Sequence, residues 1–373
     1  MSSQPTYQHH HQRQRIIVAG GGTGGHIFPA IAIANAIKKI HPDTEFLFVG
    51  AKGKMEMEKI PQAGFNIEGL DIAGFNRSSL LKNISLPYKL VKSFFQVGAI
   101  FKKFKPTAVI GVGGYSSFPV LRYAQSKNIP TFLHESNSFA GKSNIMLGKK
   151  ATKIFTATDG MQQFFPNDKI VITGNPVRQT ISNSVVQKNE AVQFFNLSVN
   201  KKTILVVGGS LGAKSINECI AQNIALFQQQ QWQLIWQTGK PFYQQAKEVV
   251  KGFDNIYMSD FIAQMEYAYA AADVVVSRSG AMAVAELCLV KKPVVFVPYP
   301  FAAEDHQTAN AMALVNKKAA LLVNDKDVMA LLMNTLTALV NNEQHQQQLI
   351  ANISTLAINN ADEIIANQIL AAI

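Results

Sequence analysis

The sequence predicts an α/β protein of two doubly wound parallel sheets, with a ligand cleft between them. At 373 residues and 47% hydrophobic composition, the chain is long and apolar enough to bury two cores. Short apolar strands alternate with helical stretches, which is typical of parallel sheets covered on both faces. A strand, a glycine turn and a helix follow one another at residues 15–40 and again at residues 203–227. Ligands of such sheets bind at the carboxyl ends of the strands, so we expect the site between the halves.

The first half should begin at the apolar strand Arg15–Gly20, followed by a glycine turn and a helix from Pro29. Residues 1–14 are expected to be a disordered extension, because they are polar and histidine-rich and lack the apolar stretch of a secretory signal. The further strands predicted in this half cover residues 44–50, 107–114, 129–135, 153–158 and 169–174.

The second half should begin at the strand Thr203–Val207. Its further strands are predicted at residues 232–239, 272–280, 292–300 and 319–324. Proline and polar residues interrupt the periodicity over residues 174–191, which we therefore interpret as the linker.

The formal charge of +11 favours a negatively charged partner, which leaves nucleic acid, an anionic membrane and a phosphorylated substrate open. Cys219 and Cys288 lie in apolar helical stretches, which predicts buried free thiols rather than a disulfide or a zinc site. No window supplies the ~18 apolar residues of a transmembrane helix, since Lys89 and Lys92 interrupt the best candidate. We therefore expect a soluble or peripheral protein.

A basic, apolar segment at residues 75–105 contains no acidic residue. Cations beside apolar side chains suit an anionic lipid surface, although an ordinary amphipathic helix packed on the sheet is the alternative. No recognised nucleic-acid motif accompanies the charge, so we do not expect nucleic acid as a partner. The apolar side chains in question are Phe75, Leu80, Leu81, Ile84, Phe94 and Phe95.

Glycine turns follow several predicted strands, where backbone N–H groups can approach phosphate. Gly20, Gly22 and Gly25 match the G-x-G-x-x-G pattern of dinucleotide sites. That pattern also needs an acidic residue after the second strand, where residues 50–52 read Gly-Ala-Lys, so a dinucleotide is disfavoured. Further turns at residues 111–114 and 208–212 suggest several phosphate-approaching loops.

Three titratable residues follow predicted strands and are candidates for acid–base chemistry. His26 stands just before the first helix, where an imidazole can act as general base for a sugar hydroxyl, and a buried or capping histidine is the alternative. His134 and Glu135 end a strand, and a structural role is the alternative for both. Later, Gly280 opens a helix whose second turn carries Glu286, so N–H groups would face a diphosphate and the carboxylate a ribose.

Two further charged features have competing interpretations. Arg178 could neutralise phosphate at the hinge, although a surface position is usual for an arginine in a linker. Asp325 and Asp327 imitate the D-x-D of metal-dependent transferases, but their place before a helix favours capping. We predict no metal site.

Taken in order, these motifs resemble the MurG family of bacterial N-acetylglucosaminyltransferases. They are GGTGGHIFPA, GGYSSFP, HESN, GNPVR, GGSLGA, SRSGAMAVAE and EDHQTANA, spread over residues 21–312. The resemblance implies the GT-B arrangement of two Rossmann-like domains, at residues 15–177 and 178–356. It also implies that a C-terminal helix at about residues 357–373 packs back on the first domain.

The resemblance further implies the site. His26 is the candidate base, with His134 and Glu135 nearby. Glu286 would take the ribose hydroxyls, Ile262 would lie against the uracil and Gln307 would contact the donor sugar. The full set expected around UDP-N-acetylglucosamine is Thr23, Gly24, Gly25, Asn137, Arg178, Ser210, Ile262, Ala281, Met282, Ala283, Val284, Ala285, Glu286 and Gln307. One departure is Ser136 of HESN, where the family usually has glutamine.

The implied reaction is an inverting, metal-independent transfer of N-acetylglucosamine to the 4-hydroxyl of lipid I, which forms lipid II. No cofactor is expected. The implied partners are UDP-N-acetylglucosamine, lipid I and the anionic inner face of the bacterial plasma membrane, with cell-wall synthesis proteins left open. A UDP-N-acetylglucosamine 2-epimerase, which shares the architecture and donor, and a non-enzymatic nucleotide-binding module are the alternatives.

Overall fold

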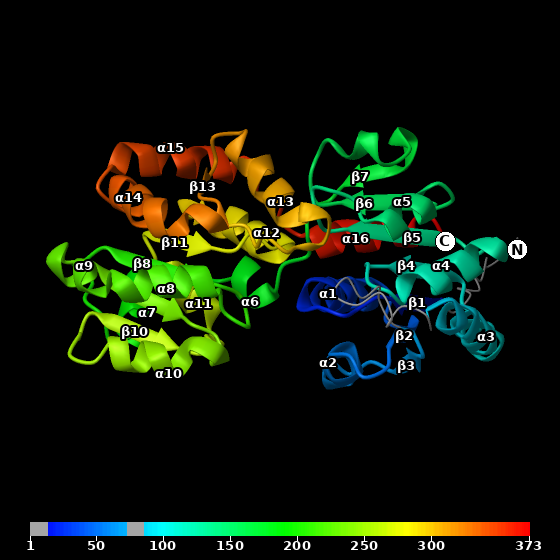
Figure 1. Cartoon of the computed structure of the whole chain (residues 1–373). Coiled ribbons are helices and arrows are strands. Elements are labelled where there is room, and N and C mark those ends of the chain that lie inside the picture. The colour runs from blue at the N-terminus through cyan, green and yellow to red at the C-terminus, as the bar shows by residue number, and fades with distance from the viewer. Residues whose placement is uncertain (1–13, 73–85) are drawn as a thin grey trace, which may run out of the picture.

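The computed structural model describes residues 14–72 and 86–373, which form two α/β units side by side (Figure 1). The first unit contains a seven-stranded sheet in the order β3-β2-β1-β4-β5-β6-β7, and the second a six-stranded sheet in the order β10-β9-β8-β11-β12-β13. All the pairings are parallel. The predicted fold class is confirmed.

The first sheet reverses its strand order between β1 and β4, which places their carboxyl ends at a switch point. Its strands are β1 (Arg15–Ala19), β2 (Glu45–Ala51), β3 (Ile67–Leu70), β4 (Ala108–Gly111), β5 (Thr131–Glu135), β6 (Lys153–Thr156) and β7 (Ile170–Ile172). Its helices are α1 (Gly24–Ile40), α2 (Glu56–Gln62), α3 (Leu86–Phe104), α4 (Ser117–Ser126) and α5 (Lys142–Gly148). The glycine loops after β1 and β4 therefore lie next to each other.

The second sheet has the corresponding switch between β8 and β11. Its strands are β8 (Thr203–Val207), β9 (Gln233–Gln237), β10 (Ile256–Ser259), β11 (Val274–Ser277), β12 (Val294–Phe296) and β13 (Leu321–Leu322). Its helices are α6 (Gln179–Ser182), α7 (Lys188–Phe194), α8 (Lys214–Gln222), α9 (Ile224–Gln229), α10 (Lys240–Val249), α11 (Met265–Ala271), α12 (Ala281–Val290), α13 (His306–Val315), α14 (Val328–Val340) and α15 (Glu343–Ser354).

Helix α1 begins at Gly24, five residues before the start that the sequence predicts. The buried face of the helix extends back to Ile27, and Pro29 near the amino end removes only one intrahelical hydrogen bond. His26 therefore lies in the first turn of the helix rather than before it.

The predicted linker at residues 174–191 is not irregular over its whole length. Helix α6 and the start of α7 fall inside this range, and Ile181 and Ala191 are buried in the core of the second unit. Local polarity concealed these helices because each buries only a few side chains. The exact domain boundaries stay a prediction.

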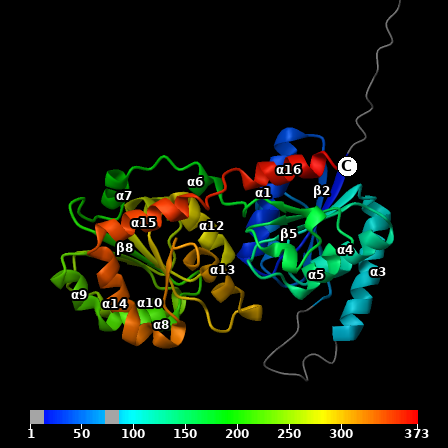
Figure 2. The same cartoon turned by 90° about the horizontal axis from the view of Figure 1, so that it is seen from above.

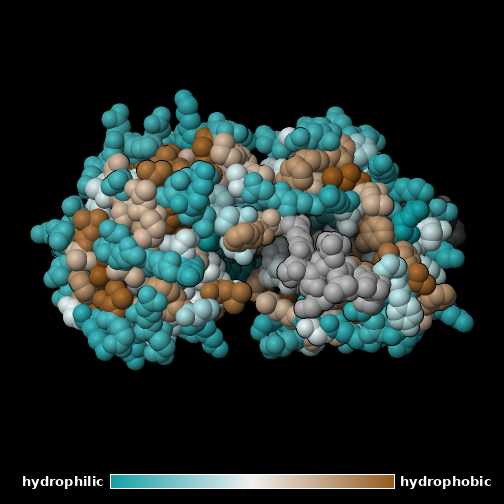
Figure 3. Space-filling view, in the orientation of Figure 1, coloured by the Kyte–Doolittle hydropathy of each residue, from teal (hydrophilic) through white to brown (hydrophobic). Residues whose placement is uncertain are grey.

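The C-terminal helix α16 (Ala361–Leu370) packs on α1, far from it in sequence (Figure 2). Its buried residues Ile365 and Ile369 join the core cluster that contains Ile33 and Ile37 of α1. The chain therefore passes between the units twice, near residues 173–178 and near residues 355–360. A furrow separates the two units in the space-filling view (Figure 3).

Three further expectations concern the cysteines and the membrane. Cys219 and Cys288 are both free and buried in helices α8 and α12, as predicted. Among the described residues, no helix is both long enough and apolar enough to span a membrane. Part of the predicted lipid-facing segment, including Phe75, Leu80, Leu81 and Ile84, lies outside the described residues.

Candidate active site

A buried carboxylate organises the glycine loop after β1. Glu56, which is 1% exposed, accepts hydrogen bonds from the N–H groups of Gly22 (2.8 Å) and Ala51 (3.0 Å). A Cβ on Gly21 would lie 2.3 Å from the Glu56 carboxyl carbon, so only glycine fits there. The N–H group of Gly22 already donates to the Glu56 carboxylate and is not available to a phosphate. This loop is therefore poorly suited to a dinucleotide diphosphate. The sequence pattern did not reveal Glu56.

His26 lies between the first two glycine loops. Its Nδ1 is 2.9 Å from the carbonyl oxygen of Gly21, and because a carbonyl only accepts, Nδ1 carries the proton. Nε2 is then the basic nitrogen, and it lies so close to Gly113 that a Cβ there would be only 2.8 Å away. Gly113 has φ +94° and leaves the space beside Nε2 open.

The environment of His26 keeps its imidazole neutral. Burial is the main cause that lowers the pKa of His26 below 6.5, and the hydrogen bond to Gly21 opposes that effect. His306, which belongs to the second unit, also lowers this pKa, so His26 faces the furrow between the units. Among the described residues no hydrogen bond to Nε2 is found, and a partly exposed, neutral imidazole of this kind can accept a proton from a hydroxyl group.

His134 is enclosed behind this site. It is 1% exposed, and neither ring nitrogen makes a hydrogen bond of normal geometry. Burial lowers the pKa of His134 to about 4, and the nearby backbone of Gly174 opposes this effect. A neutral, buried imidazole of this kind is suited to packing rather than to proton exchange with a substrate.

Glu135 is saturated with hydrogen bonds from its own loop. Its Oε1 accepts from the backbone N–H of Asn137 (3.1 Å) and more weakly from the side chain (3.3 Å). Its Oε2 accepts from Gly141 N–H (3.1 Å) and Asn144 Nδ2 (2.8 Å). Glu135 therefore shapes the loop after β5, which carries Asn137.

Asn310 of α13 holds that loop against the second unit. Its Oδ1 accepts from Ser138 N–H (2.8 Å), and its Nδ2 donates to Asn137 Oδ1 (3.2 Å) and to the Ser279 carbonyl (3.2 Å). Both ends of the Asn137 amide are thus engaged within the protein. Asn310, which is 2% exposed, was not among the expected site residues.

Glu286 is the centre of a hydrogen-bonded group in the second unit. Its Oε1 accepts from Arg178 Nη2 at 3.0 Å and from Nε at 3.3 Å, while its Oε2 accepts from Tyr269 Oη at 2.9 Å. The Glu286 carboxylate is therefore oriented by two partners from different elements, and it keeps free lone pairs. Arg178, at the N-cap of α6, thus pairs with this carboxylate.

Gln237, at the end of β9, connects two loops that carry expected donor-site residues. Its Nε2 donates to the Gly209 carbonyl (2.9 Å), next to the exposed Ser210. Its Oε1 accepts from Ile262 N–H (2.9 Å). The Ile262 side chain is 3% exposed, so a base could meet only its edge.

The expected residues of helix α12 lie on different sides of the helix. Its N-cap residue is Gly280, which has no side chain to accept from the first-turn N–H groups. These N–H groups are therefore left for a ligand. Ala281, Val284 and Ala285 line a cavity on one side of the helix, whereas Glu286 pairs with Arg178 on another. Met282 and Ala283 are partly exposed in the first turn.

The other expected residues lie at or near the amino-terminal ends of α1 and α13. Gln307 Oε1 accepts from Tyr299 N–H (3.0 Å), which fixes the orientation of this amide. Thr23 is the N-cap of α1 and is exposed, and Gly24 and Gly25 form the first turn of that helix.

The capping interpretation of the two aspartates is wrong. Asp327 stands at the N-cap of α14 without a side-chain cap hydrogen bond, and Asp325 pairs with Arg278 Nη1 at 2.5 Å. The nearby guanidinium of Arg278 offers a stronger partner than a backbone N–H. Within residues 14–72 and 86–373, no cluster of three or more histidine, cysteine or acidic side chains could hold a metal ion.

Both units match one family. The model described as Glycosyltransferase family 28 N-terminal domain matches residues 16–156, and the model described as Glycosyltransferase family 28 C-terminal domain matches residues 203–367. The chain belongs to glycosyltransferase family 28. The resemblance that the motifs indicate is therefore confirmed at the level of the family.

Named relatives of this family 28 chain agree with that assignment. A protein of Phocaeicola vulgatus is 52% identical over 306 residues, 81% of each chain, and is named UDP-N-acetylglucosamine--N-acetylmuramyl-(pentapeptide) pyrophosphoryl-undecaprenol N-acetylglucosamine transferase. The crystal structure of Acinetobacter baumannii MurG is similar with a TM-score of 0.77 and 26% identity, over 96% of this chain and 99% of that one. The family 28 chain thus has the GT-B fold of MurG.

An epimerase shares the fold as well. UDP-GlcNAc 2-epimerase from Neisseria meningitidis has a TM-score of 0.66 at 15% identity and covers 96% of this chain and 100% of that one. At this identity the likeness shows the fold alone.

Proposed function

We propose that the chain transfers N-acetylglucosamine from UDP-N-acetylglucosamine to the 4-hydroxyl of the muramyl sugar of lipid I, which forms lipid II. The relatives named for this transfer support the substrates. The observation that carries the chemistry is the neutral imidazole of His26, whose Nε2 lies beside Gly113 and makes no hydrogen bond within the part of the chain that the structure describes.

His26 acts as the general base in a single displacement. Its Nε2 takes the proton of the acceptor hydroxyl while the hydroxyl oxygen attacks the anomeric carbon of the donor. The bond from that carbon to the β-phosphate oxygen breaks, and UDP leaves with the electron pair. Attack on the face opposite UDP converts an α-linked donor into a β-linked product. His134 and Glu135 position the surrounding loops.

The second unit binds the donor. Glu286, held by Arg178 and Tyr269, accepts the ribose hydroxyls, and the first-turn N–H groups of α12 stabilise the charge that grows on the departing diphosphate. Ser210 and the fixed amide of Gln307 reach the diphosphate and the donor sugar. This arrangement supplies positive electrostatic potential without a metal ion.

Helix α3 docks the first unit on an anionic membrane surface. Tyr88, Val91 and Phe95 are 70%, 56% and 77% exposed, and their spacing places them on one face of the helix. Lys102 and Lys103 are exposed at its end. Apolar side chains would enter the headgroup region while the lysines meet lipid phosphates. We place this surface on the cytoplasmic side, where UDP-sugars and lipid I are made.

The proposed reaction predicts one product. Incubation with UDP-N-acetylglucosamine and a short-chain lipid I analogue in EDTA should give a disaccharide lipid and UDP in equal amounts, measured by mass spectrometry. UDP-N-acetylmannosamine formed without the acceptor would instead identify a 2-epimerase, and the transfer proposal would be wrong.

A further inference from the structure

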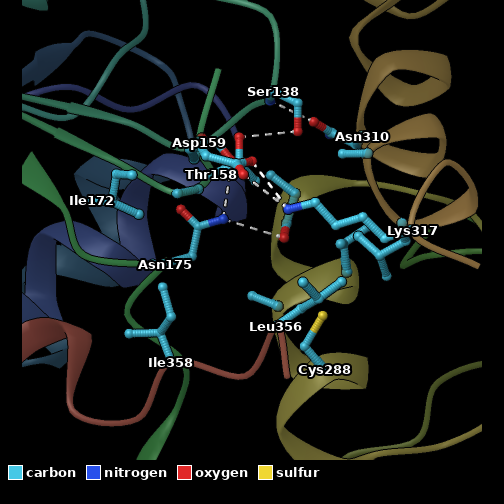
Figure 4. Close-up of a pocket in the computed structure, with 18 of the residues that line it drawn as sticks. Ser138, Thr158, Asp159, Ile172, Asn175, Cys288, Asn310, Lys317, Leu356 and Ile358 are labelled. Atoms are coloured by element: carbon cyan, nitrogen blue, oxygen red, sulfur yellow. Dashed lines mark hydrogen bonds and ion pairs between the residues drawn. The ribbon is translucent and has the colours of Figure 1, made fainter. Parts of the chain in front are cut away.

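A cavity of about 270 Å³ lies between the two units, beside both passages of the chain from one unit to the other (Figure 4). We call it the hinge cavity. Its walls come from the ends of β5, β6 and β7, from helices α12 and α13, and from residues near 174–177 and 355–358. Three of the expected donor-site residues, Ala281, Val284 and Ala285, also line this space, whereas Glu286 of the same helix pairs with Arg178 outside it.

The walls of the hinge cavity are mainly apolar. Val284 and Cys288 are one turn apart on α12, and Ala313 and Leu314 face them from α13. Leu356, from the second passage between the units, closes the cavity in Figure 4. An engineered apolar cavity of ~150 Å³ is large enough to bind benzene, so the larger hinge cavity can hold a bicyclic ring.

One polar atom in this apolar wall has no partner. Asn175 is 6% exposed, and its Oδ1 accepts no hydrogen bond from residues 14–72 and 86–373. Its Nδ2 donates to the carbonyl oxygens of Ser136 (2.9 Å) and Ala281 (3.3 Å), which fixes the amide between the two units. Buried acceptors are normally satisfied, so an acceptor held in this way is suited to a ligand that donates.

The lysine at the edge of the hinge cavity already has an acidic partner. Lys317 pairs with Asp159 at 3.0 Å across the two units, and both residues line the cavity. An uncharged ligand can therefore enter without breaking an ion pair or burying an unpaired charge.

We propose that the hinge cavity binds a small, uncharged, mainly apolar molecule that carries one hydrogen-bond donor, which it directs to Asn175 Oδ1. The apolar area supplies most of the affinity and the single acceptor supplies orientation. This site adjoins the proposed donor site along α12, where Ala281, Val284 and Ala285 line the cavity, but Glu286, Arg178 and Ser210 do not.

A matched pair of ligands tests the role of Asn175. Indole and indene have nearly the same shape, but only indole carries an N–H donor. Isothermal titration calorimetry on the full chain should show indole binding about threefold to tenfold more tightly than indene. Equal affinities would show that Asn175 Oδ1 does not bind the ligand, and absence of indole binding up to its solubility would overturn the whole proposal.

A matched pair of variants tests the location. Ala313→Leu places a larger side chain in the hinge cavity and should abolish indole binding. Ala330→Leu is the same substitution at an exposed position of α14 and should leave binding unchanged. Thermal unfolding of both variants checks that each is folded. Indole affinity that is equal in the two folded variants would place the ligand elsewhere.

Competition with UDP separates the hinge cavity from the donor site. Saturating UDP should leave a finite indole affinity. If indole affinity instead falls in proportion to UDP concentration without limit, the two ligands share one site and the proposal of a separate site is wrong.

Discussion

The hydroxyl group of Tyr269 should contribute both to stability and to donor binding, and Tyr269→Phe removes only that group. Tyr269 Oη donates to Glu286 Oε2 at 2.9 Å inside the second unit. Burial and the Glu286 carboxylate raise the pKa of Tyr269 well above 10, so the phenol stays a donor at working pH. A buried hydrogen bond to a charged group is worth about 1.5–3 kcal/mol. Because phenylalanine keeps the ring, the substitution leaves little empty space, and lost packing adds little to the free-energy cost.

We therefore expect Tyr269→Phe to lower the free energy of unfolding in urea by about 1.5–3 kcal/mol. Since Glu286 keeps Arg178 but loses its second anchor, KM for UDP-N-acetylglucosamine should rise while kcat changes less. Tyr267→Phe is the matched control on the same helix, because Tyr267 Oη donates to the exposed Glu190 at 2.8 Å. Its cost should stay within about 0.5 kcal/mol. Equal stability losses in the two variants, with unchanged KM in both, would refute the role given to Tyr269.

Three other predictions concern pH and the membrane. The pKa of His26 lies below 6.5, and a general base must be neutral to accept a proton. The value of kcat/KM for transfer should therefore be flat from pH 7 to 8 and fall only below pH 6.5. A midpoint of this fall above pH 7 would contradict the assignment of His26 as the base. The pKa of His134 is about 4 in the folded protein against 6.5 ordinarily, so the unfolded chain binds the extra proton between these values. The free energy of unfolding should therefore fall by about 3 kcal/mol as pH drops from 7 to 4, and His134→Gln should reduce that dependence in urea titrations; an unchanged dependence would refute the linkage. The double variant Tyr88→Ser, Phe95→Ser should weaken sedimentation with anionic vesicles by at least about tenfold, whereas Val185→Ser, at a still more exposed position outside α3, should not; equal retention would remove α3 from the docking surface.

The fold could be predicted because its signals are local. Apolar runs such as that of β1 are buried on both faces of a parallel sheet, and the repeated glycine turns mark both switch points. The start of α1 was missed because glycine and proline suppress the helix signal, although the buried face continues to Ile27. Helix α7 was missed because only Ala191 and Val192 are buried along it.

Parts of the site could not be predicted because their partners are distant in sequence. Glu56 reaches Gly22 only because β2 pairs with β1, and no local pattern links the two residues. The sequence around Tyr269 predicts an apolar helix and no polar contact. The hydrogen bond from Tyr269 to Glu286 depends on how α11 and α12 lie relative to each other. The pairing of Arg178 with the buried Glu286 carboxylate could not be foreseen either, because the two residues lie far apart in the sequence. The sequence shows which charged and polar side chains are present, whereas the packing of helices and strands decides which of these side chains pair.

The most direct test of the account is the rate of N-acetylglucosamine transfer to a short-chain lipid I analogue by the parent and by His26→Ala, each with and without added imidazole. If Nε2 of His26 takes the proton of the acceptor, the variant should lose a factor of about 10²–10⁴, and imidazole should restore part of the rate in the variant alone. A variant that is folded, binds UDP and keeps a rate within about tenfold of the parent would contradict the central claim.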